Sequence, residues 1–439
     1  MGEFITFKVI SIIFSLSFLG MAYMCKRCFG GWLNPGSIFN LFWSLYTFLP
    51  LFLAYYAPIN PLAVAYIVIF CAFFSGPMFF FDWKKARESN AKKRPPNYYF
   101  RKSQFVLGFY TISLLSIFFM LFGMALQGFS ITDMITNPIG TAGRYAGARY
   151  ASELSLNFFS RAGLLGSYIS IILGGLVYGA IRDNNRKVIV LAFLPSLLAM
   201  MLQSAKGLFF LSVFLFLAGI LICRIYRGEF YLFNRATIKK SVQAIIVVLP
   251  ILIMSFIARG MSNASSEEII DKIQLYLTSY SSGHLYAFSD WFSYRYFDYS
   301  LLDYSDVSAP PGYYTLMSLF NSMGYYVDLP MGVYDDYFDY EGRIKSNIYT
   351  IFRGGILDFS LFGFLLYGFF VGVTVNFFFY RLLYSRFNPA YIVFFILYVA
   401  LSYQSYLIST LMWKTIPFVG LLSFLIVFVL TKIRFFRRI

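Results

Sequence analysis

Residues 347–370 read NIYTIFRGGILDFSLFGFLLYGFF, a segment that opens polar, carries one arginine and one aspartate, and then becomes apolar. A charge close to hydrocarbon is costly, so it usually has a partner or a function. Tyr349 and Arg353 are four residues apart and share a face on a helix. We expect the glycine pair 354–355 to loosen or end that turn, which places Asp358 near the start of the next membrane helix, where a carboxylate is favoured. An ion pair between Arg353 and Asp358 has poor helical geometry, so the sequence favours Arg353 as an anion ligand.

Composition places this segment in an integral membrane protein. Of the 439 residues, 59% are hydrophobic and 13% are charged, whereas an ordinary soluble domain carries about 25% charge. Aromatic residues make up 22% of the chain, which suits interfacial belts and platforms for sugar rings. A single histidine argues against a histidine-rich metal site. The sequence therefore predicts an all-α polytopic bundle.

About eleven stretches are long enough to span a bilayer, which takes roughly 17–25 apolar residues. They are residues 5–24, 37–57, 61–81, 104–126, 158–181, 188–204, 207–223, 241–257, 360–380, 390–408 and 416–431. We expect one membrane domain over residues 1–439. Two long outer loops are expected, 127–157 and 258–359, and the second is large enough to have structure of its own before the chain re-enters the membrane.

The basic residues of the loops predict the orientation. Residues 82–102 hold eight Lys and Arg, which favours the cytoplasm. Alternation of the spans then puts the N-terminus outside and the C-terminus inside, with 24 of the 36 Lys and Arg on the cytoplasmic side. This asymmetry accounts for the formal charge of +16, so no nucleic-acid partner is needed.

Several outer cations are candidate anion ligands. Lys206, in the short turn QSAKG, is expected at the outer N-terminus of a helix, where lysine and free N–H groups can bind phosphate, although it could instead anchor the helix in headgroups. Arg259 follows the span that ends near residue 257; there a cation also suits the helix dipole. Arg144 and Arg149 lie among small residues that let a ligand approach, and could equally be plain loop arginines.

An aromatic stretch surrounds the one histidine. Ten of the 24 residues from 276 to 299 are aromatic, which suits either an interfacial helix or a carbohydrate groove. Tyr280 and Trp291 are therefore candidate sugar contacts. His284 is either structural or a base or hydrogen-bonding group on the outer side. The acidic segment 333–343 matches no EF-hand loop and is expected as a solvated, hydrogen-bonding surface.

The multi-span layout, the large late loop, the QSAKG turn and the entry of NIYTIFRGGILDFSLFG into a membrane helix together resemble the oligosaccharide repeat-unit polymerases of the O-antigen (Wzy) type, relatives of the O-antigen ligases. The resemblance implies a GT-C-like fold in a bacterial inner membrane, with the N-terminus periplasmic. It implies transfer of a growing glycan from undecaprenyl diphosphate to a sugar hydroxyl of a new lipid-linked repeat unit, without metal or cofactor. A chain-length regulator is an implied partner. Lys206, Arg259 and Arg353 would then face the lipid diphosphate.

One departure from the ligases concerns the acceptor base. Ligases tend to carry histidine-asparagine where this chain has Ser346-Asn347, which favours a polymerase and leaves the base unassigned. Asn347 and Tyr349 are expected to contact substrate. A lipid-linked oligosaccharide flippase or other transporter is the alternative class, and the absence of a visible internal repeat counts against it.

Overall fold

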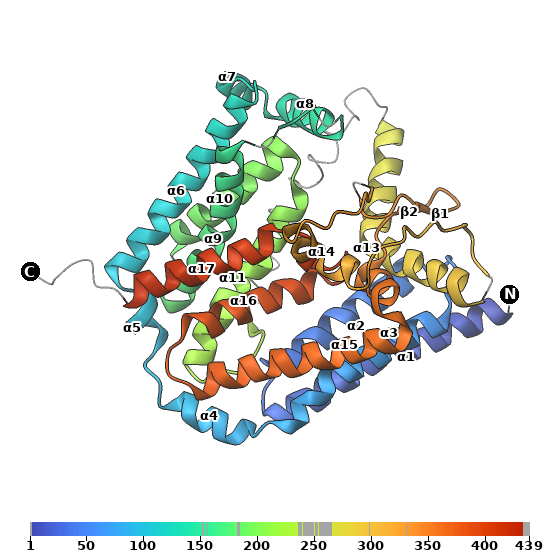
Figure 1. The fold of residues 1–439 in the computed structure, drawn as a ribbon, viewed down its shortest axis with the longest axis horizontal. Coiled ribbons are helices and arrows are strands. Elements are labelled where there is room, and N and C mark those ends of the chain that lie inside the picture. The colour runs from blue at the N-terminus through green and yellow to red at the C-terminus, as the bar shows by residue number, and fades with distance from the viewer. Residues whose placement is uncertain are drawn as a thin grey trace, which may run out of the picture. The chain divides into compact units, whose positions relative to one another are not determined.

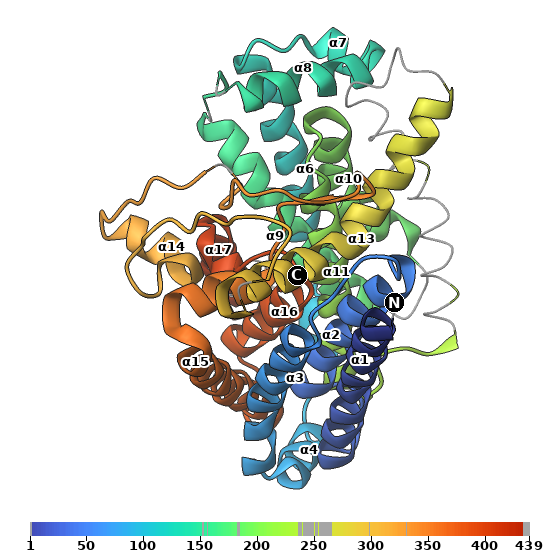
Figure 2. The ribbon, with the colours of Figure 1, turned by 90° about the vertical axis from the view of Figure 1, so that its right-hand side faces the viewer.

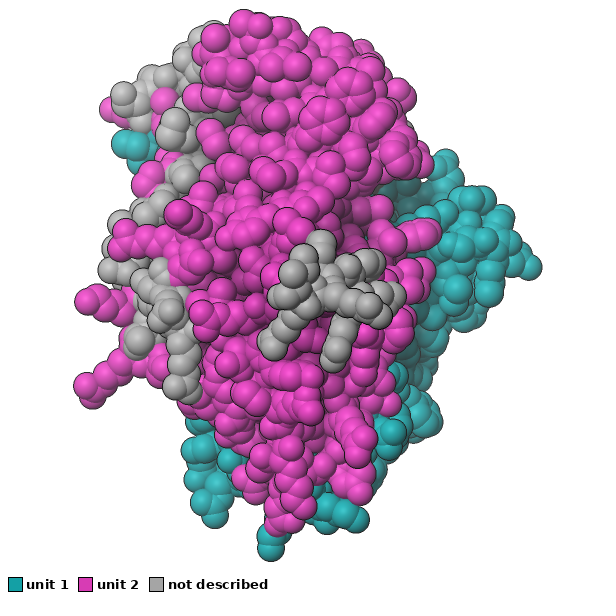
Figure 3. Space-filling view, turned by 90° about the vertical axis from the view of Figure 1, so that its left-hand side faces the viewer, with its two compact units in different colours: residues 1–86, 270–381, 401–417 teal, residues 87–269, 382–400, 418–439 magenta. Residues whose placement is uncertain are grey.

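The computed structural model describes residues 2–151, 153–155, 157–181, 185–235, 239, 250, 253, 266–297, 299–330 and 332–432. These residues form helices almost throughout (Figure 1). The chain divides into two compact units, shown in separate colours in Figure 3. Unit 1 comprises residues 1–86, 270–381 and 401–417, and unit 2 comprises residues 87–269, 382–400 and 418–439.

Unit 1 is built around three neighbouring helices at the start of the chain (Figure 2). They are α1 (Gly2–Phe29), α2 (Pro35–Leu53) and α3 (Pro61–Ser75), followed by the 3-10 turn η1 (Gly76–Phe80). α2 and α3 each start with proline after an asparagine cap: the side chain of Asn34 accepts from Ser37 N, and that of Asn60 accepts from Leu62 N. Proline has no N–H to leave unsatisfied there, so these two signals fix where both helices begin.

The later part of unit 1 adds a largely polar layer over residues 270–346, which takes in all of α13 but its first four residues. It contains α13 (Ser266–Phe297), α14 (Tyr313–Ser322) and the antiparallel strands β1 (Phe338–Tyr340) and β2 (Ile344–Ser346). The hairpin is tied to α13, because Lys345 N donates to the hydroxyl of Ser279 at 2.9 Å. The 3-10 turn η2 (Thr410–Met412) contacts α14. This segment, expected as an outer loop, therefore holds ordered structure where it is described.

α15 (Thr350–Tyr384) follows the hairpin and is interrupted at Ser360, whose backbone has φ 62° and ψ 175°. The helix is sharply bent at this point, so that a Cβ on Gly355 would collide with the ring of Phe364. The break was expected at the glycine pair 354–355, and that expectation is wrong. The two glycines remain helical, and their missing side chains leave room for Phe364 and for Tyr314.

Unit 2 is centred on α9 (Phe158–Ala180), which contacts α6 (Ser103–Leu126), α10 (Arg186–Gln203) and α11 (Lys206–Tyr226). α9 and α11 approach closely at Gly175 and Gly219, where a Cβ on either residue would strike the opposite backbone. Small residues allow such close helix packing in membranes. α5 (Pro96–Phe100), α7 (Ile131–Thr136) and α8 (Pro138–Tyr150) are short helices of this unit. α4 (Trp83–Ala91), α16 (Pro389–Gln404) and α17 (Thr415–Lys432) include residues of both units.

Within the described residues, nine helices are long and apolar enough to cross a membrane. They are Glu3–Phe29, Pro35–Leu53, Pro61–Phe80, Ser103–Leu126, Phe158–Ala180, Arg186–Gln203, Lys206–Tyr226, Thr350–Tyr384 and Thr415–Lys432. Pro389–Gln404 is also apolar but has 16 residues. The expected span 241–257 lies outside the described residues except for Pro250 and Ile253, so the count of eleven stays a prediction. The chain is a multi-pass, all-α membrane protein.

Candidate functional site

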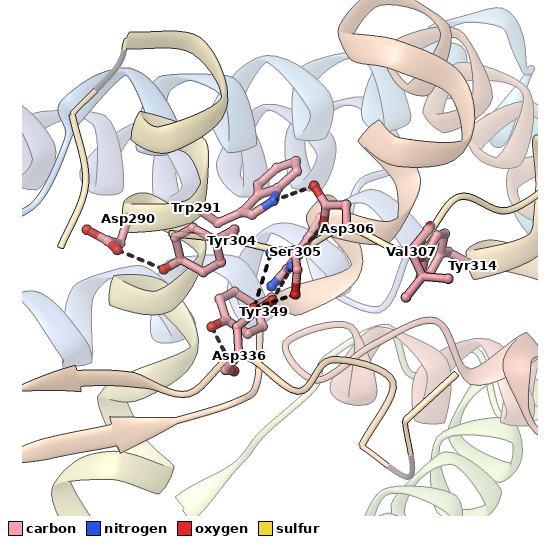
Figure 4. Close-up of polar contacts among 10 residues, drawn as sticks. Asp290, Trp291, Tyr304, Ser305, Asp306, Val307, Tyr314, Asp336 and Tyr349 are labelled. Atoms are coloured by element: carbon pink, nitrogen blue, oxygen red, sulfur yellow. Dashed lines mark hydrogen bonds and ion pairs between the residues drawn. The ribbon is translucent and has the colours of Figure 1, made fainter. Parts of the chain in front are cut away.

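Arg353 is the centre of a buried polar cluster in unit 1. Figure 4 labels its neighbours Trp291, Asp306 and Asp336. Its side chain is fully buried and donates to Asp306 Oδ1 from Nε at 3.1 Å and from Nη2 at 2.9 Å. Nη2 also lies 2.5 Å from Asp336 Oδ2, and Trp291 Nε1 donates to the other oxygen of Asp306 at 3.2 Å. Nη1 has no hydrogen-bond partner among the described residues. One cation and two carboxylates thus leave the cluster with a formal charge of −1.

Four aromatic rings enclose this guanidinium. Its Cζ atom lies 4.2 Å from the ring centroid of Tyr334, 4.3 Å from Tyr349, 5.1 Å from Tyr304 and 5.7 Å from Trp291. Rings at these distances attract a cation through their quadrupoles, and more strongly where water is excluded. Tyr349 also donates to the backbone oxygen of Asp336 at 3.0 Å. The enclosure explains how an arginine can be buried near the start of an apolar helix.

The sequence predicted that Asp358 would stabilise the N-terminus of its own membrane helix. Its side chain instead caps the N-terminus of α14. Its carboxylate accepts from Tyr314 N at 3.0 Å and from Thr315 N at 2.6 Å, at the first turn of α14. A carboxylate is favoured at such an end because the first N–H groups have no partner within the helix. Asp358 therefore holds α14 against α15, while Arg353 has carboxylates of its own.

Beside this cluster, unit 1 contains a cavity of about 570 Å³. Its apolar lining comes from the N-terminal turns of α1, the connection between α2 and α3, the end of α13 and β1: Phe4, Phe7, Pro58, Ile59, Pro61, Leu62, Phe297, Tyr299, Leu301 and Phe338. Its polar lining is Glu3, Asn60, Ser289, Asp290 and Ser293. Among the described residues, no Lys or Arg lines it. Since α1 and α3 begin here and both are apolar helices, the cavity lies at one end of unit 1's membrane-type helices.

Hydrogen bonds to side chains of α13 position the polar side of this cavity. Asn60 N donates to the hydroxyl of Ser289 at 2.8 Å, and Asn60 Nδ2 donates to that of Ser293 at 3.0 Å. Asp290 Oδ1 accepts from Leu301 N at 2.9 Å, and its Oδ2 accepts from the Tyr304 hydroxyl at 2.7 Å. Each carboxylate oxygen can accept a further hydrogen bond. Asp290 thus has acceptor capacity left for a group bound in the cavity.

Burial sets the acid–base character of Asp290. Its side chain is 9% exposed. Loss of hydration raises the pKa of this carboxyl above its ordinary value, although hydrogen bonds from Leu301, Tyr304 and Leu302 act in the opposite direction. A carboxylate whose pKa is raised is a stronger base than an exposed aspartate. Tyr304 also touches Arg353, so it joins the cavity to the buried ion cluster (Figure 4).

His284 lies in the same unit but is not a lining residue of this cavity. It is 3% exposed, and its Nε2 lies 2.9 Å from the backbone oxygen of Tyr46. Because that oxygen only accepts, Nε2 carries the proton and Nδ1 is the bare nitrogen. Burial lowers the pKa of His284 to about 4. The imidazole is therefore neutral at pH 7 and packs against the rings of Tyr46 and Tyr406.

A buried lysine, Lys8, fastens α1 to α13 close to these residues. Its Nζ atom donates to the hydroxyl of Tyr286 at 2.5 Å and to the backbone oxygen of Ala54 at 3.3 Å. Its Nζ also lies 4.5 Å from the ring centroid of Tyr286. A buried charge in an apolar helix needs such partners. Lys8 therefore positions the first turns of α1, which supply Phe4 and Phe7 to the cavity.

The remaining residues predicted from sequence lie in several places. Trp291 and Tyr349 belong to the Arg353 cluster; Tyr280 is exposed on α13 and Asn347 is half-buried after β2. In unit 2, Lys206 is 8% exposed at the first position of α11, after a two-residue turn in which Ser204 has a left-handed backbone. Arg144 and Arg149 are exposed on α8, and Arg144 pairs with Asp133 at 2.7 Å. Arg259 lies outside the described residues.

Sequence reasoning missed the acidic members of the site. Asp290 and Asp306 were not singled out, and Asp336 was seen only as part of a solvated acidic surface. One signal was available: Asp290 precedes Trp291 in the aromatic stretch, so a carboxylate there accompanies the side chains suited to sugar binding. Separately, no three or more His, Cys, Asp or Glu side chains gather as metal ligands in the described part of the chain.

Comparison with known proteins found no matching family model, no matching curated protein and no matching solved structure. The fold itself defines a class, that of multi-pass α-helical membrane proteins. Within that class, unit 1 carries an enclosed polar cluster and an aromatic, carboxylate-bearing cavity.

Proposed function

We propose that the protein polymerises oligosaccharide repeat units carried on undecaprenyl diphosphate, at the outer face of a bacterial inner membrane. The observation that carries the proposal is the 570 Å³ cavity of unit 1. Phe and Tyr rings offer it flat apolar faces, while Asp290, Asn60 and two serines offer hydrogen-bonding groups. Sugar rings present the same two surfaces, C–H faces and hydroxyl edges.

The charge of this lining favours a neutral hydroxyl-bearing group over a phosphate. Its ionisable members are the carboxylates Glu3 and Asp290, with no cation among the described lining residues. A phosphate would be repelled by such a lining, whereas a sugar hydroxyl can donate to it. The cavity therefore suits the acceptor sugar. Because it lies where apolar helices begin, an acceptor sugar on a membrane lipid can reach it.

Asp290 is the acceptor-activating base in this proposal. Its carboxylate takes the proton of an acceptor hydroxyl as that oxygen attacks the anomeric carbon of the growing glycan. The new glycosidic bond forms while the bond to the lipid diphosphate breaks, and undecaprenyl diphosphate leaves with the electron pair. Leu301 N and the Tyr304 hydroxyl hold the carboxylate in place. A positioned base of this kind contributes about 10²–10⁴-fold to the rate.

Arg353 acts in the proposal as a positioning residue. Asp306 and Asp336 already occupy its guanidinium, so it orients Trp291 and Tyr304, the neighbours of Asp290. Lys206, in unit 2, and Arg259, outside the described residues, stay predictions from the sequence as ligands of a diphosphate. A cation close to that group would stabilise the charge that develops on it as the bond breaks.

The test is reconstitution of the purified protein with a synthetic undecaprenyl-diphosphate repeat unit of its host strain, in the presence of a chelator. The expected product is a ladder of glycans that differ by one repeat unit. A fluorescent version of the same lipid in liposomes measures transport in parallel. If the lipid crosses the bilayer and no ladder forms, the flippase alternative replaces the polymerase.

A further inference from the structure

Unit 2 holds a second cavity, of about 740 Å³, whose lining is strongly basic. Three chain segments far apart in the sequence meet there: residues 89–99, residues 384–387 and Lys432 at the end of α17. In Figure 1, α5 and the end of α17 lie next to each other. The lining consists of Ser89, Lys92, Lys93, Arg94, Tyr98, Tyr99, Tyr384, Ser385, Arg386, Phe387 and Lys432.

Five of these lining residues are Lys or Arg, and no carboxylate lines the cavity in the described part of the chain. Burial lowers the pKa of one of them, Lys93, to about 7. The ion pairs found among the described residues involve none of the five. Such a concentration of like charge on a concave surface repels itself and attracts counter-ions. Ordinary surface cations of a membrane protein can spread into water, whereas these converge on one cavity. A bound anion would offset the repulsion among these side chains.

Aromatic contacts keep the cavity in shape. The rings of Tyr99 and Phe387 stack with centroids 4.0 Å apart and planes 14° from parallel. Arg94 lies 4.3 Å from the centroid of Tyr98, and Lys432 lies 5.7 Å from that of Phe387. Lys93 is anchored by its hydrogen bond to the backbone oxygen of Leu382. The cations are thus presented on a stacked platform rather than on free loops.

We propose that this cavity binds a phosphate-bearing anion, supplied by the headgroup of an anionic phospholipid. The volume of the cavity, about 740 Å³, is larger than one phosphate requires. It suits a headgroup with two phosphates, such as that of cardiolipin. It lies where the apolar helix α17 ends, the depth at which headgroups are found. Loop charges predict this end to face the cytoplasm, where basic pockets beside membrane helices recognise such lipids. A soluble phosphate compound has the same chemistry as the headgroup, so the test must distinguish these two sources of phosphate.

The test uses the full-length protein in detergent, titrated with cardiolipin, phosphatidylcholine or inorganic pyrophosphate and followed by native mass spectrometry. The site variant combines Arg94→Gln, Arg386→Gln and Lys432→Gln. The matched control combines Arg101→Gln, Arg186→Gln and Lys187→Gln, exposed residues of the same unit that lie on the same predicted side of the membrane. Both variants lose three positive charges, so they differ only in whether the charges line the cavity.

The expected result is cardiolipin binding that weakens at least ~10-fold in the site variant and is unchanged in the control. Pyrophosphate bound by the wild type and lost in the site variant, with no preference for cardiolipin over phosphatidylcholine, would support the phosphate site and overturn its lipid source. Equal weakening in both variants would overturn the site, because it would show that net charge alone attracts the anion. Binding of neither probe would overturn it as well.

Discussion

The Nη2 atom of Arg353 lies 2.5 Å from Oδ2 of Asp336, across 17 residues of chain. The same nitrogen lies 2.9 Å from Asp306, so one buried guanidinium joins the first turn of α15 to two segments that precede it. Removing one partner of a buried ion pair is strongly destabilising, because the charges left behind have lost both water and partner. The cluster is therefore a structural centre of unit 1's polar layer.

Arg353→Ala is expected to destabilise this layer by about 3–5 kcal/mol. Arg353→Lys should recover only part of the loss, because an ammonium cannot span two carboxylates as a planar guanidinium does. Thermal unfolding in detergent provides the measurement. Arg343→Ala, at an exposed position in the same layer, is the control. An Arg353→Ala protein that unfolds like the wild type yet fails to polymerise would contradict the positioning role and restore the role of anion ligand.

Asp290→Asn is expected to raise the unfolding midpoint at pH 7. The folded pKa of this carboxyl is raised above the ordinary 3.8, so the folded state holds its proton more tightly than the unfolded state does. Stability is then lost as pH rises from the ordinary aspartate range through the raised pKa. The gain in the variant should vanish at pH values below that range. A lower midpoint for Asp290→Asn at pH 7 would contradict this account of burial.

His284 gives a pH dependence of opposite sign. Its folded pKa is lowered from 6.5 to about 4, so the unfolded state binds the proton more readily. The wild type should lose stability as pH falls from 6.5 toward 4. His284→Gln, which cannot take up that proton, should show a shallower loss over the same interval. Unfolding midpoints measured at half-unit steps of pH provide the comparison, and parallel curves for both proteins would count against a buried neutral imidazole.

The sequence predicted the apolar helices well because each is encoded locally. Ten of the eleven expected spans coincide with apolar helices, while span 241–257, apart from Pro250 and Ile253, falls outside the described residues. The break in α15 was misplaced because the glycine pair at 354–355 serves close packing, and the bend depends on the backbone of Ser360. In the sequence, a glycine pair is equally consistent with a helix break and with close helix packing. The contact of Gly355 with Phe364, which shows that packing is the reason here, is a tertiary contact that the local sequence does not reveal.

The partners of Arg353 could not be found from spacing. Asp306 lies 47 residues before it and Asp336 lies 17 residues before it, whereas periodicity reports only neighbours three or four residues away. The burial of the Arg353 side chain could not be predicted either, because it depends on residues far away in the sequence. An arginine beside an apolar run indicates that something compensates its charge, but only the folded chain shows whether carboxylates or a substrate do so.

The central claim is that Asp290 activates the acceptor hydroxyl in a saccharide cavity, and its direct test is the initial rate of polymerisation. Wild type, Asp290→Asn and Asp303→Asn would be compared with the synthetic repeat unit. Asp303 is exposed in the segment after α13 and does not line the cavity, so it provides the same charge change as a control. We predict a rate at least ~10²-fold lower for Asp290→Asn, with folding intact, and a normal rate for Asp303→Asn. A wild-type rate for Asp290→Asn would contradict the claim.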